Sequence, residues 1–493
     1  MKALTLSRSE KRSATSLVAS ATGAVMLFLT FRLTISLTSV EIMGAWALLQ
    51  GLFIVSRVAD SGMGANITRY VSVNLAESRE VSGRAVAGAG VLIGLVPVVL
   101  ICGITFAPIV WYVKGLFRGS HAATEVVPLA ILCVAFAATS SLATTLLAIC
   151  EGAGRLVAKN GVIIASNCLG IVVAYPSLRH FGAPGVGITY CAVSISQLAL
   201  ATVLLHRDRS LRGPRGERVG HISRHLWREN AQLSGVAALR LTFEPLTKFL
   251  LSRVTTLAGV AAFELALRVT TQIRVLLQSS AQPLLLMGAR KTAAPTAEVA
   301  ASFSRARGIL YVVVKSALWV QIAATTVLSY VGLGRLDPHF EIFYVVLVVA
   351  NAINSLGLTG YFLQLSSGIL VPLLRVHAVM AIMNLTLGVI AAALLGQYGV
   401  VCAYAITMSY GGLALAAMHA RLRTPPNVVS TFRWQTVRGD ALGLGLAIVV
   451  IASGAFGQLA RAIATSCVAT VILSGLAVRS VLIATSRKAR VSA

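Results

Sequence analysis

Residues 85–113 read AVAGAGVLIGLVPVVLICGITFAPIVWYV, a stretch without a single charged side chain. An α-helix needs about 20 apolar residues to cross the roughly 30 Å of hydrocarbon in a bilayer, so this stretch is long enough to span one. Apolar runs of comparable length recur from Leu17 to Ala484. Charged residues make up 12% of the chain, whereas a soluble protein has about 25%. The sequence therefore predicts an all-α polytopic membrane protein.

Fourteen apolar runs are predicted to be transmembrane helices. They cover residues 17–39, 42–58, 85–113, 126–150, 161–178, 184–205, 231–256, 259–287, 308–334, 341–366, 369–396, 398–420, 440–456 and 459–485. An even number of spans places both termini on the same side of the membrane.

The distribution of basic residues predicts which side that is. Cytoplasmic loops of membrane proteins carry an excess of Lys and Arg. Most of the 42 Lys and Arg residues fall in the segments on the side of the termini, and the opposite side holds only Lys114, Arg118, Arg179, Arg335 and Arg461. We expect both termini to be cytoplasmic, in the bacterial cytoplasmic (inner) membrane. The net charge of +26 then needs no nucleic-acid partner.

An internal repeat is indicated by two segments that lie 214 positions apart. They read Gly182-Ala-Pro-Gly185-Val186 followed by Tyr190, and Gly396-Gln-Tyr-Gly399-Val400 followed by Tyr404; a weaker match pairs Ala45-Trp46 with Ala262-Phe263. An even number of intervening spans keeps the orientation, which predicts two parallel-repeat six-helix bundles with two C-terminal helices added. The alternative is coincidence between helix starts that are rich in small residues.

The predicted domains follow from this repeat. They are an N-terminal six-helix bundle at 1–205, a basic cytoplasmic linker at 206–230, a C-terminal six-helix bundle at 231–420, and two further transmembrane helices with a cytoplasmic tail at 421–493. No connecting loop is long enough for a folded domain. The working parts are therefore expected inside the bilayer, which favours a transporter over an enzyme with a soluble catalytic unit.

Basic residues inside the predicted spans suggest the charge of the cargo. They are Arg32, Arg240, Lys248, Arg253, Arg268, Arg274 and Lys315. A charge at mid-bilayer costs at least about 2.5–3.5 kcal/mol, so such residues usually face the protein interior or water. Arg32, Arg274 and Lys315 have no carboxylate within one helical turn of sequence. We therefore predict an anionic cargo.

Three of these cations have carboxylates at helical spacing. Arg240 lies four residues before Glu244. Glu244 lies four residues before Lys248, and Glu264 lies four residues before Arg268, so each pair shares one helix face. For Glu264 and Arg268, an ion pair that ties helices together and a cargo site are both open interpretations. The repeat brings Arg32 within one position of Lys248, and we expect these two cations to face each other across a cavity. Arg253, near a helix end, fits a snorkelling side chain.

Amide side chains accompany the cations. Gln278 and Gln282 continue the line from Arg274 at four-residue spacing, and further amides within spans are Gln50, Asn167, Gln321, Asn351, Asn354, Gln364 and Asn384. Amides can hydrogen-bond sugar hydroxyls, but they also join neighbouring helices. As a set beside the cations, they favour a polar cavity for a glycan.

Several motifs resemble one family. The chain reads Gly44-Ala-Trp-Ala-Leu-Leu-Gln50 and then Asp60-Ser-Gly62-Met-Gly64-Ala65-Asn-Ile-Thr-Arg69-Tyr70, with further matches at Glu151-Gly-Ala-Gly154-Arg155 and Ala262-Phe-Glu-Leu-Ala266. These motifs resemble the Wzx-type polysaccharide flippases of the multidrug/oligosaccharidyl-lipid/polysaccharide exporter superfamily. The resemblance runs through nearly the whole chain, in the order of the spans.

This resemblance implies a V-shaped pair of bundles that works by alternating access. It implies a flippase for undecaprenyl-pyrophosphate-linked oligosaccharide in cell-surface polysaccharide biosynthesis (O-antigen, exopolysaccharide or capsule), working beside a polysaccharide polymerase and a chain-length regulator. Family members carry cavity cations in the first, seventh and eighth spans, where this chain has Arg32, Lys248, Arg268 and Arg274. Many members have twelve spans, so the role of the last two helices is open.

The predicted site has two groups of residues. The substrate-binding group is Arg32, Arg240, Lys248, Arg268, Arg274, Lys315, Gln278 and Gln282; the gating or ion-coupling group is Asp60, Arg69, Glu244 and Glu264. Asp60 is expected to pair with Arg69 or Arg57 and close the cytoplasmic side, or else to cap a helix. Glu244 or Glu264 is a candidate for ion coupling, although the membrane potential alone could drive an anion outward.

No cofactor or metal is predicted. The sequence has no Walker A lysine, GxSxG, HExxH or CxxC motif. Three other functions stay open: a cation or drug antiporter of the same superfamily, a membrane-embedded glycan polymerase or ligase, and a scaffold. The first would need unpaired carboxylates in its cavity, and the second usually carries a sizeable outside loop.

Overall fold

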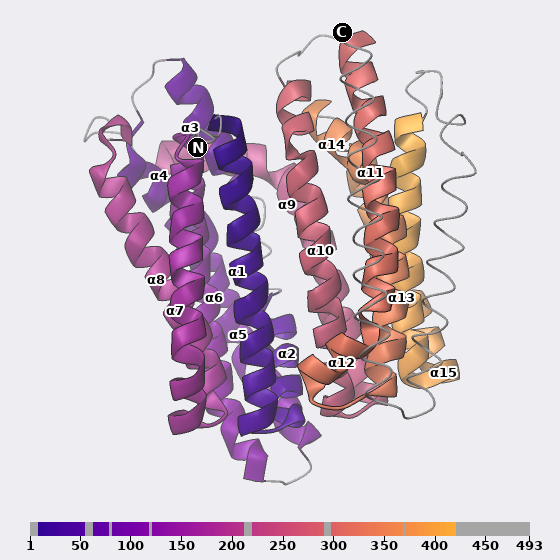
Figure 1. Ribbon diagram of the computed structural model, residues 1–493. Coiled ribbons are helices and arrows are strands. Elements are labelled where there is room, and N and C mark those ends of the chain that lie inside the picture. The colour runs from indigo at the N-terminus through magenta and orange to yellow at the C-terminus, as the bar shows by residue number, and fades with distance from the viewer. Residues whose placement is uncertain are drawn as a thin grey trace, which may run out of the picture. The chain divides into compact units, whose positions relative to one another are not determined.

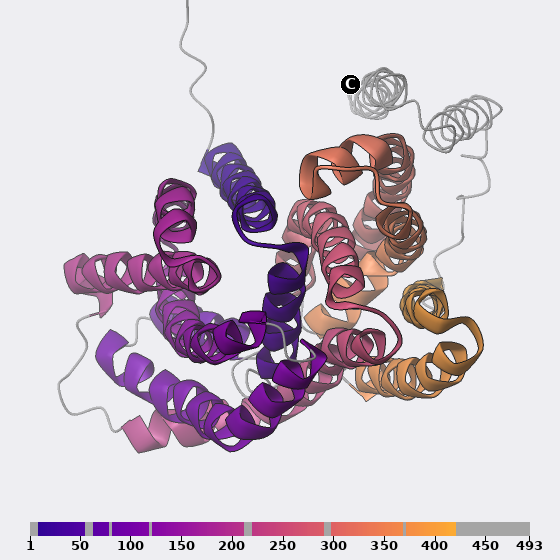
Figure 2. The same ribbon diagram turned by 90° about the horizontal axis from the view of Figure 1, so that it is seen from below.

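A computed structural model describes residues 8–54, 63–77, 81–117, 121–211, 219–289, 297–367 and 371–420, and nearly all of them are helical. The chain divides into two compact units, Met1–Ala261 (unit 1) and Ala262–Ala493 (unit 2). Figure 1 shows the long helices of each unit from the side, and Figure 2 shows them end-on.

Unit 1 contains nine α-helices among its described residues and the beginning of a tenth. They are α1 (Arg8–Leu37), α2 (Val40–Ile54), α3 (Met63–Ala76), α4 (Gly83–Gly90), α5 (Val96–Leu116), α6 (Val126–Gly152), α7 (Leu156–Phe181), α8 (Pro184–Arg207), α9 (Val219–Val254) and α10 (Leu257–Ala289). A π-helical segment, Val91–Leu95, joins α4 to α5. The helix α10 continues into unit 2.

Unit 2 is built from the rest of α10 and five further helices among the described residues. These are α11 (Ala297–Ala323), α12 (Thr325–Leu333), α13 (Pro338–Ser355), α14 (Leu358–Ser367) and α15 (Val371–Ala420). The chain is non-helical at Gly396 inside α15, so this element is two helices that meet at a kink. The kink falls where the sequence predicts one span to end at 396 and the next to begin at 398.

The apolar helices make this a multi-pass membrane protein. In the part of the chain that the structure describes, six helices are long and apolar enough to cross a membrane: Thr15–Leu37, Gly83–Leu116, Ala122–Gly152, Leu156–Phe181, Pro184–Arg207 and Val371–Met418. A seventh is counted if Leu310–Ala323 and Thr325–Leu333, bent by 56°, form one span. The count of fourteen stays a prediction, and spans 440–456 and 459–485 lie outside the described residues.

The helix α3 was not predicted from the sequence, which indicates no transmembrane helix between the spans 42–58 and 85–113. Met63, Ile67 and Val71 recur every four residues, so they form one face of the helix, and all three are buried in an apolar cluster with residues of α4, α6 and α9. Arg69 lies on the exposed face. The helix was missed because it is amphipathic and too short to span a membrane.

Candidate functional site

Lys248 on α9 is completely buried, with 0% of its side chain exposed. Its ammonium donates a 2.6 Å hydrogen bond to Glu244 Oε1 and a 3.2 Å hydrogen bond to the backbone oxygen of Ala47 on α2. The predicted i,i+4 ion pair therefore forms, and the carboxylate offsets the charge of the lysine. Whether Lys248 also binds cargo stays a prediction.

The pair formed by Glu264 and Arg268 on α10 repeats this local pattern. Arg268 Nε donates to Glu264 Oε1 over 2.7 Å, while Glu264 is 2% exposed and Arg268 is 29% exposed. The carboxylate is thus held inside unit 2 and the guanidinium lies closer to its surface. This geometry shows the ion pair that the spacing predicts; a role for either residue in cargo binding or ion coupling stays a prediction.

Arg32 on α1 differs from both of these cations. It is half-buried, and its neighbours Phe31 and Thr34 are almost fully buried. Within the part of the chain that the structure describes, Arg32 makes no side-chain hydrogen bond or ion pair. This sets Arg32 apart from Lys248 and Arg268, whose ion pairs the structure shows.

A polar pocket lies among α10, α11 and α13 in unit 2. Its cavity volume is only about 10 Å³, room for a single water molecule. Its lining residues are Thr270, Ile273, Arg274, Val314, Ala317, Gln321, Asn351, Ala352 and Ser355. Arg274 is one of the predicted cargo-binding cations, and Gln321 and Asn351 are two of the amides expected in a polar cavity. The fold thus brings residues from three distant segments into one place.

The polar groups in this pocket are only partly used by the protein itself. Gln321 Nε2 donates to the backbone oxygen of Ala317 over 3.1 Å, while its Oε1 is buried and accepts no hydrogen bond from the described residues. The same is true of the buried hydroxyl of Ser355. A buried polar atom without a partner is unfavourable unless water or a ligand meets it. The pocket therefore offers acceptors and donors beside the Arg274 cation.

Other predicted site residues lie outside this pocket or outside the described part. Lys315 on α11 is half-buried next to the lining residue Val314, and Arg69 on α3 is exposed. Asp60 lies outside the described residues, as do the side chains of Arg240, Gln278 and Gln282, so their roles stay predictions.

Several of the predicted amides join helices instead. Asn167 Nδ2 on α7 donates to Thr22 Oγ1 on α1 over 3.4 Å, and seven residues earlier Asn160 makes the same contact with Thr15 over 3.2 Å. These contacts lie two helical turns apart along α1 and α7. In unit 2, Asn354 donates to the backbone oxygen of Met408 over 2.6 Å. For these amides the helix-joining interpretation fits the observed contacts.

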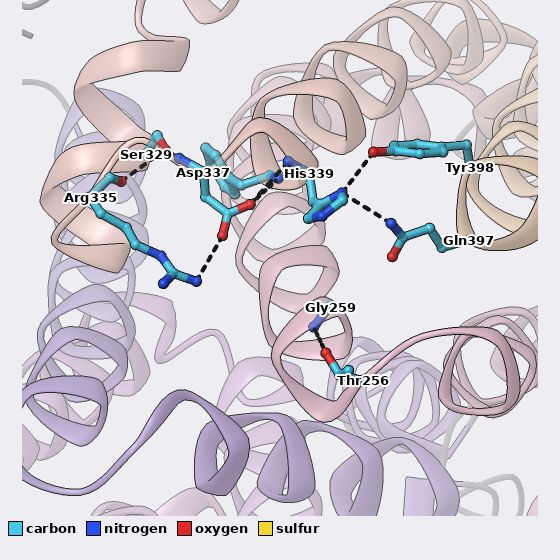
Figure 3. Close-up of polar contacts among 9 residues, drawn as sticks. Thr256, Gly259, Ser329, Arg335, Asp337, His339, Gln397 and Tyr398 are labelled. Atoms are coloured by element: carbon cyan, nitrogen blue, oxygen red, sulfur yellow. Dashed lines mark hydrogen bonds and ion pairs between the residues drawn. The ribbon is translucent and has the colours of Figure 1, made fainter. Parts of the chain in front are cut away.

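A second polar cluster, not recognised from the sequence, lies at the beginning of α13. Asp337 caps this helix by accepting hydrogen bonds from the backbone of His339 and Phe340, and it pairs with Arg335 over 3.2 Å. His339 Nδ1 lies 2.7 Å from the hydroxyl of Tyr398 and 3.0 Å from Gln397 Nε2 (Figure 3). The only sequence signal was Asp337 followed by Pro338, a common helix start. The cluster is exposed, and it joins the start of α13 to the kink of α15.

Comparisons with known proteins place the fold. No protein family profile matches the sequence, and no curated protein matches it. Solved structures do match. A multidrug resistance MATE family transporter of the MOP superfamily, in an inward-facing conformation, is 14% identical, with 82% of this chain and 97% of that chain covered and a TM-score of 0.61. The chain shares its fold with this transporter.

Two further structures with this fold come from different branches. The Vibrio cholerae MATE transporter VcmN is 16% identical, with 85% of this chain and 96% of that chain covered and a TM-score of 0.58. The lipid II flippase MurJ, in an inward closed conformation, is 12% identical, with 96% and 99% covered and a TM-score of 0.65. At these identities the MOP fold is shared, and the cargo has to be argued from the residues of this chain.

Proposed function

We propose that this chain flips a polyprenyl-pyrophosphate-linked oligosaccharide from the cytoplasmic to the outer leaflet of the bacterial cytoplasmic membrane. The observation that carries the proposal is the pocket of unit 2, in which Arg274 shares a polar lining with Gln321 and Asn351. This is the composition that the sequence analysis expects for a glycan attached to an anionic group.

The chemistry of the pocket matches both parts of such a headgroup. A guanidinium binds phosphate oxygens through two charge-assisted hydrogen bonds, and amides can donate to or accept from sugar hydroxyls. No carboxylate is among the described residues that line the pocket. A cation or drug antiporter would need one, so the pocket favours an anionic cargo over that alternative.

Two aromatic contacts support the repeat that alternating access requires. Trp46 stacks on Tyr190 in unit 1, with ring centroids 5.4 Å apart. The repeat pairs these residues with Phe263 and Tyr404, whose rings meet edge to face at 6.0 Å in unit 2. We infer that equivalent positions of two related bundles make equivalent contacts. Such a repeat is the arrangement in which transporters place cargo between bundles.

The structural matches include a lipid flippase as well as drug transporters, so the fold is compatible with a lipid-linked cargo. The lipid II flippase MurJ is matched over 96% of this chain, whereas the two MATE transporters are matched over 82% and 85%. Lipid II is the cargo named for the more extensive match. In this proposal both termini are cytoplasmic, and a polysaccharide polymerase and chain-length regulator act on the product.

The proposed step uses two of the predicted cargo-binding cations, Arg32 and Arg274. The pyrophosphate is held by Arg274 in the pocket of unit 2, the amides hold the sugars, and the polyprenyl tail stays in the lipid. Arg32 in unit 1 is a second candidate for binding an anion. Closing the cytoplasmic side then exposes the headgroup to the outside. The driving force is either ion coupling at a glutamate or the membrane potential acting on the anion.

The test replaces these two arginines by glutamine, singly and together, in cells whose surface polysaccharide depends on this chain. We expect lipid-linked oligosaccharide to accumulate on the cytoplasmic side and surface polysaccharide to fall, while the amount of inserted protein is unchanged. The matched control is Arg335→Gln, because the side chain of Arg335 is 65% exposed and lies outside the pocket. Full export by the Arg32→Gln/Arg274→Gln variant would refute the proposal.

A further inference from the structure

The whole side chain of Lys248 lies against α2. A β-carbon built at Gly51 would come within 2.8 Å of Lys248 Cδ, so the lysine stem occupies the space that a larger residue at position 51 would fill. One turn earlier on the same helix, the backbone oxygen of Ala47 accepts the hydrogen bond from Lys248 Nζ. The stem and the ammonium are thus both fitted to α2.

The charge of Lys248 is kept inside unit 1 by Glu244. The carboxylate is 25% exposed, whereas the lysine is fully buried, so the glutamate is the member of the pair that reaches the surface. Both residues of the pair are needed, because removing one partner of a buried ion pair leaves the other charge uncompensated. The ammonium is therefore occupied by the carboxylate and by Ala47 in the structure described.

The position of Lys248 in α9 explains why such an anchor is useful. Pro245 lies three residues earlier, and a proline inside a helix removes one backbone hydrogen bond and weakens the helix locally. Beyond this proline, Ser252 shares a 2.8 Å hydrogen bond with the hydroxyl of Tyr112 on α5, and Phe249 packs on the same ring at 5.2 Å. The last turns of α9 are thus held by α2 on one side and by α5 on another.

We propose that Lys248 is a positioning residue that fixes the last turns of α9 to α2, and that it does not bind the cargo. Glu244 pairs with the lysine, and Gly51 provides the room for its stem. The part of this inference that concerns cargo rests on the proposed function, whereas the part that concerns the α2–α9 contact does not. The proposal gives Arg32 and Lys248 different roles, although the sequence predicts that both face the same cavity.

The first test compares Lys248→Met, Glu244→Gln and the double variant in the full-length protein. Two quantities are measured: the thermal unfolding midpoint in detergent, which needs no cargo, and the export of lipid-linked oligosaccharide in cells. We expect each single variant to lower the midpoint and reduce export. The double variant has no charge left to compensate, so both quantities should return most of the way to wild type.

The outcomes separate the two roles. If the double variant regains its midpoint but stays as inactive in export as Arg32→Gln, Lys248 binds cargo and the proposal is overturned. If Lys248→Met leaves the midpoint unchanged, the α2–α9 contact is not stabilising and the proposal is also overturned. If wild type exports no lipid-linked oligosaccharide while the midpoints behave as expected, the proposed function fails and the positioning role stands.

A second test uses the space at position 51. Gly51→Ala should lower the midpoint in the wild-type background and have a much smaller effect in the Lys248→Ala background, where the stem is gone. The control is Gly103→Ala, because a β-carbon there meets no atom within 4 Å. An equal effect of Gly51→Ala in both backgrounds would contradict the packing of Lys248 on α2.

Discussion

Gly182 and Gly396, which lie 214 positions apart in the sequence, adopt the same positive-φ backbone conformation, with φ 61° and ψ −132° in one and φ 58° and ψ −136° in the other. Each ends one helix directly before the next begins. Three residues later, Gly185 and Gly399 each pack so closely on the carbonyl oxygen eight positions earlier that a methyl group would not fit. The two turns are therefore built in the same way in unit 1 and unit 2.

Replacing either glycine at these turns should destabilise the protein. We expect Gly182→Ala and Gly396→Ala each to lower the free energy of unfolding by about 1–3 kcal/mol, because this combination of φ and ψ is open mainly to glycine. Unfolding in detergent, followed by circular dichroism, measures this effect. Gly161→Ala on α7 is the control, since its added β-carbon meets no atom within 4 Å and alanine favours the helix. Equal stability of all three variants would contradict the strain at the turns.

Removing the amide of Asn167 should weaken the contact between α1 and α7 without affecting the cargo. Asn167→Ala is expected to lower the free energy of unfolding by about 0.6 kcal/mol, the average for a hydrogen bond between membrane helices. Thr22→Ala should add little in that background, because both changes remove the same bond. Loss of export at unchanged stability would instead place Asn167 in the cargo site.

Asp208, which follows α8, should make the protein sensitive to acid. Burial works against its ionisation, but hydrogen bonds from Arg155 and Ser210 outweigh this and hold the pKa of Asp208 below its usual value. Because the pKa is lower in the folded state, the carboxylate stabilises the fold above the unfolded-state pKa of about 3.9. This contribution is lost as the pH falls through the folded-state pKa.

The variant Asp208→Asn tests this dependence. The thermal unfolding midpoints of both proteins are measured between about pH 7 and pH 3. The midpoint of Asp208→Asn should be lower than that of wild type at neutral pH, and the two midpoints should converge in acid. Arg155→Gln should add little in the Asp208→Asn background, because Arg155 Nε pairs with Asp208 Oδ2 over 2.9 Å. A constant difference between the curves at every pH would show that Asp208 acts through packing.

The planar shape of the Arg274 guanidinium, and not only its charge, should contribute to export. Arg274→Lys keeps a cation in the pocket but loses the planar fork that binds two phosphate oxygens, so export should fall to between the levels of wild type and Arg274→Gln. The export of lipid-linked oligosaccharide is measured for wild type, Arg274→Lys and Arg274→Gln under the same conditions. Arg375→Lys, at an exposed position on α15, is the matched control and should export normally. Wild-type export by Arg274→Gln would remove this residue from the site.

The sequence predicts the helical membrane class because length and hydropathy are local properties. Residues 85–113 have enough apolar length to span a bilayer, and the structure places a helical run over Gly83–Leu116. The amphipathic helix α3 was missed because its apolar face becomes recognisable only from what packs on it. The bend between α11 and α12 was missed for a related reason, since 308–334 reads as one apolar run.

The sequence determines the two ion pairs, whereas only the tertiary structure decides the roles of the individual cations. Four-residue spacing on a helix is enough to pair Glu244 with Lys248 and Glu264 with Arg268, so the sequence determines these contacts. It does not distinguish Arg32 from Lys248, because burial depends on the neighbouring helices. Lys248 is enclosed by tertiary packing, which includes its contacts with Ala47 and Gly51 on α2. Likewise, Arg274 comes close to two amides from distant parts of the chain because α10, α11 and α13 pack together.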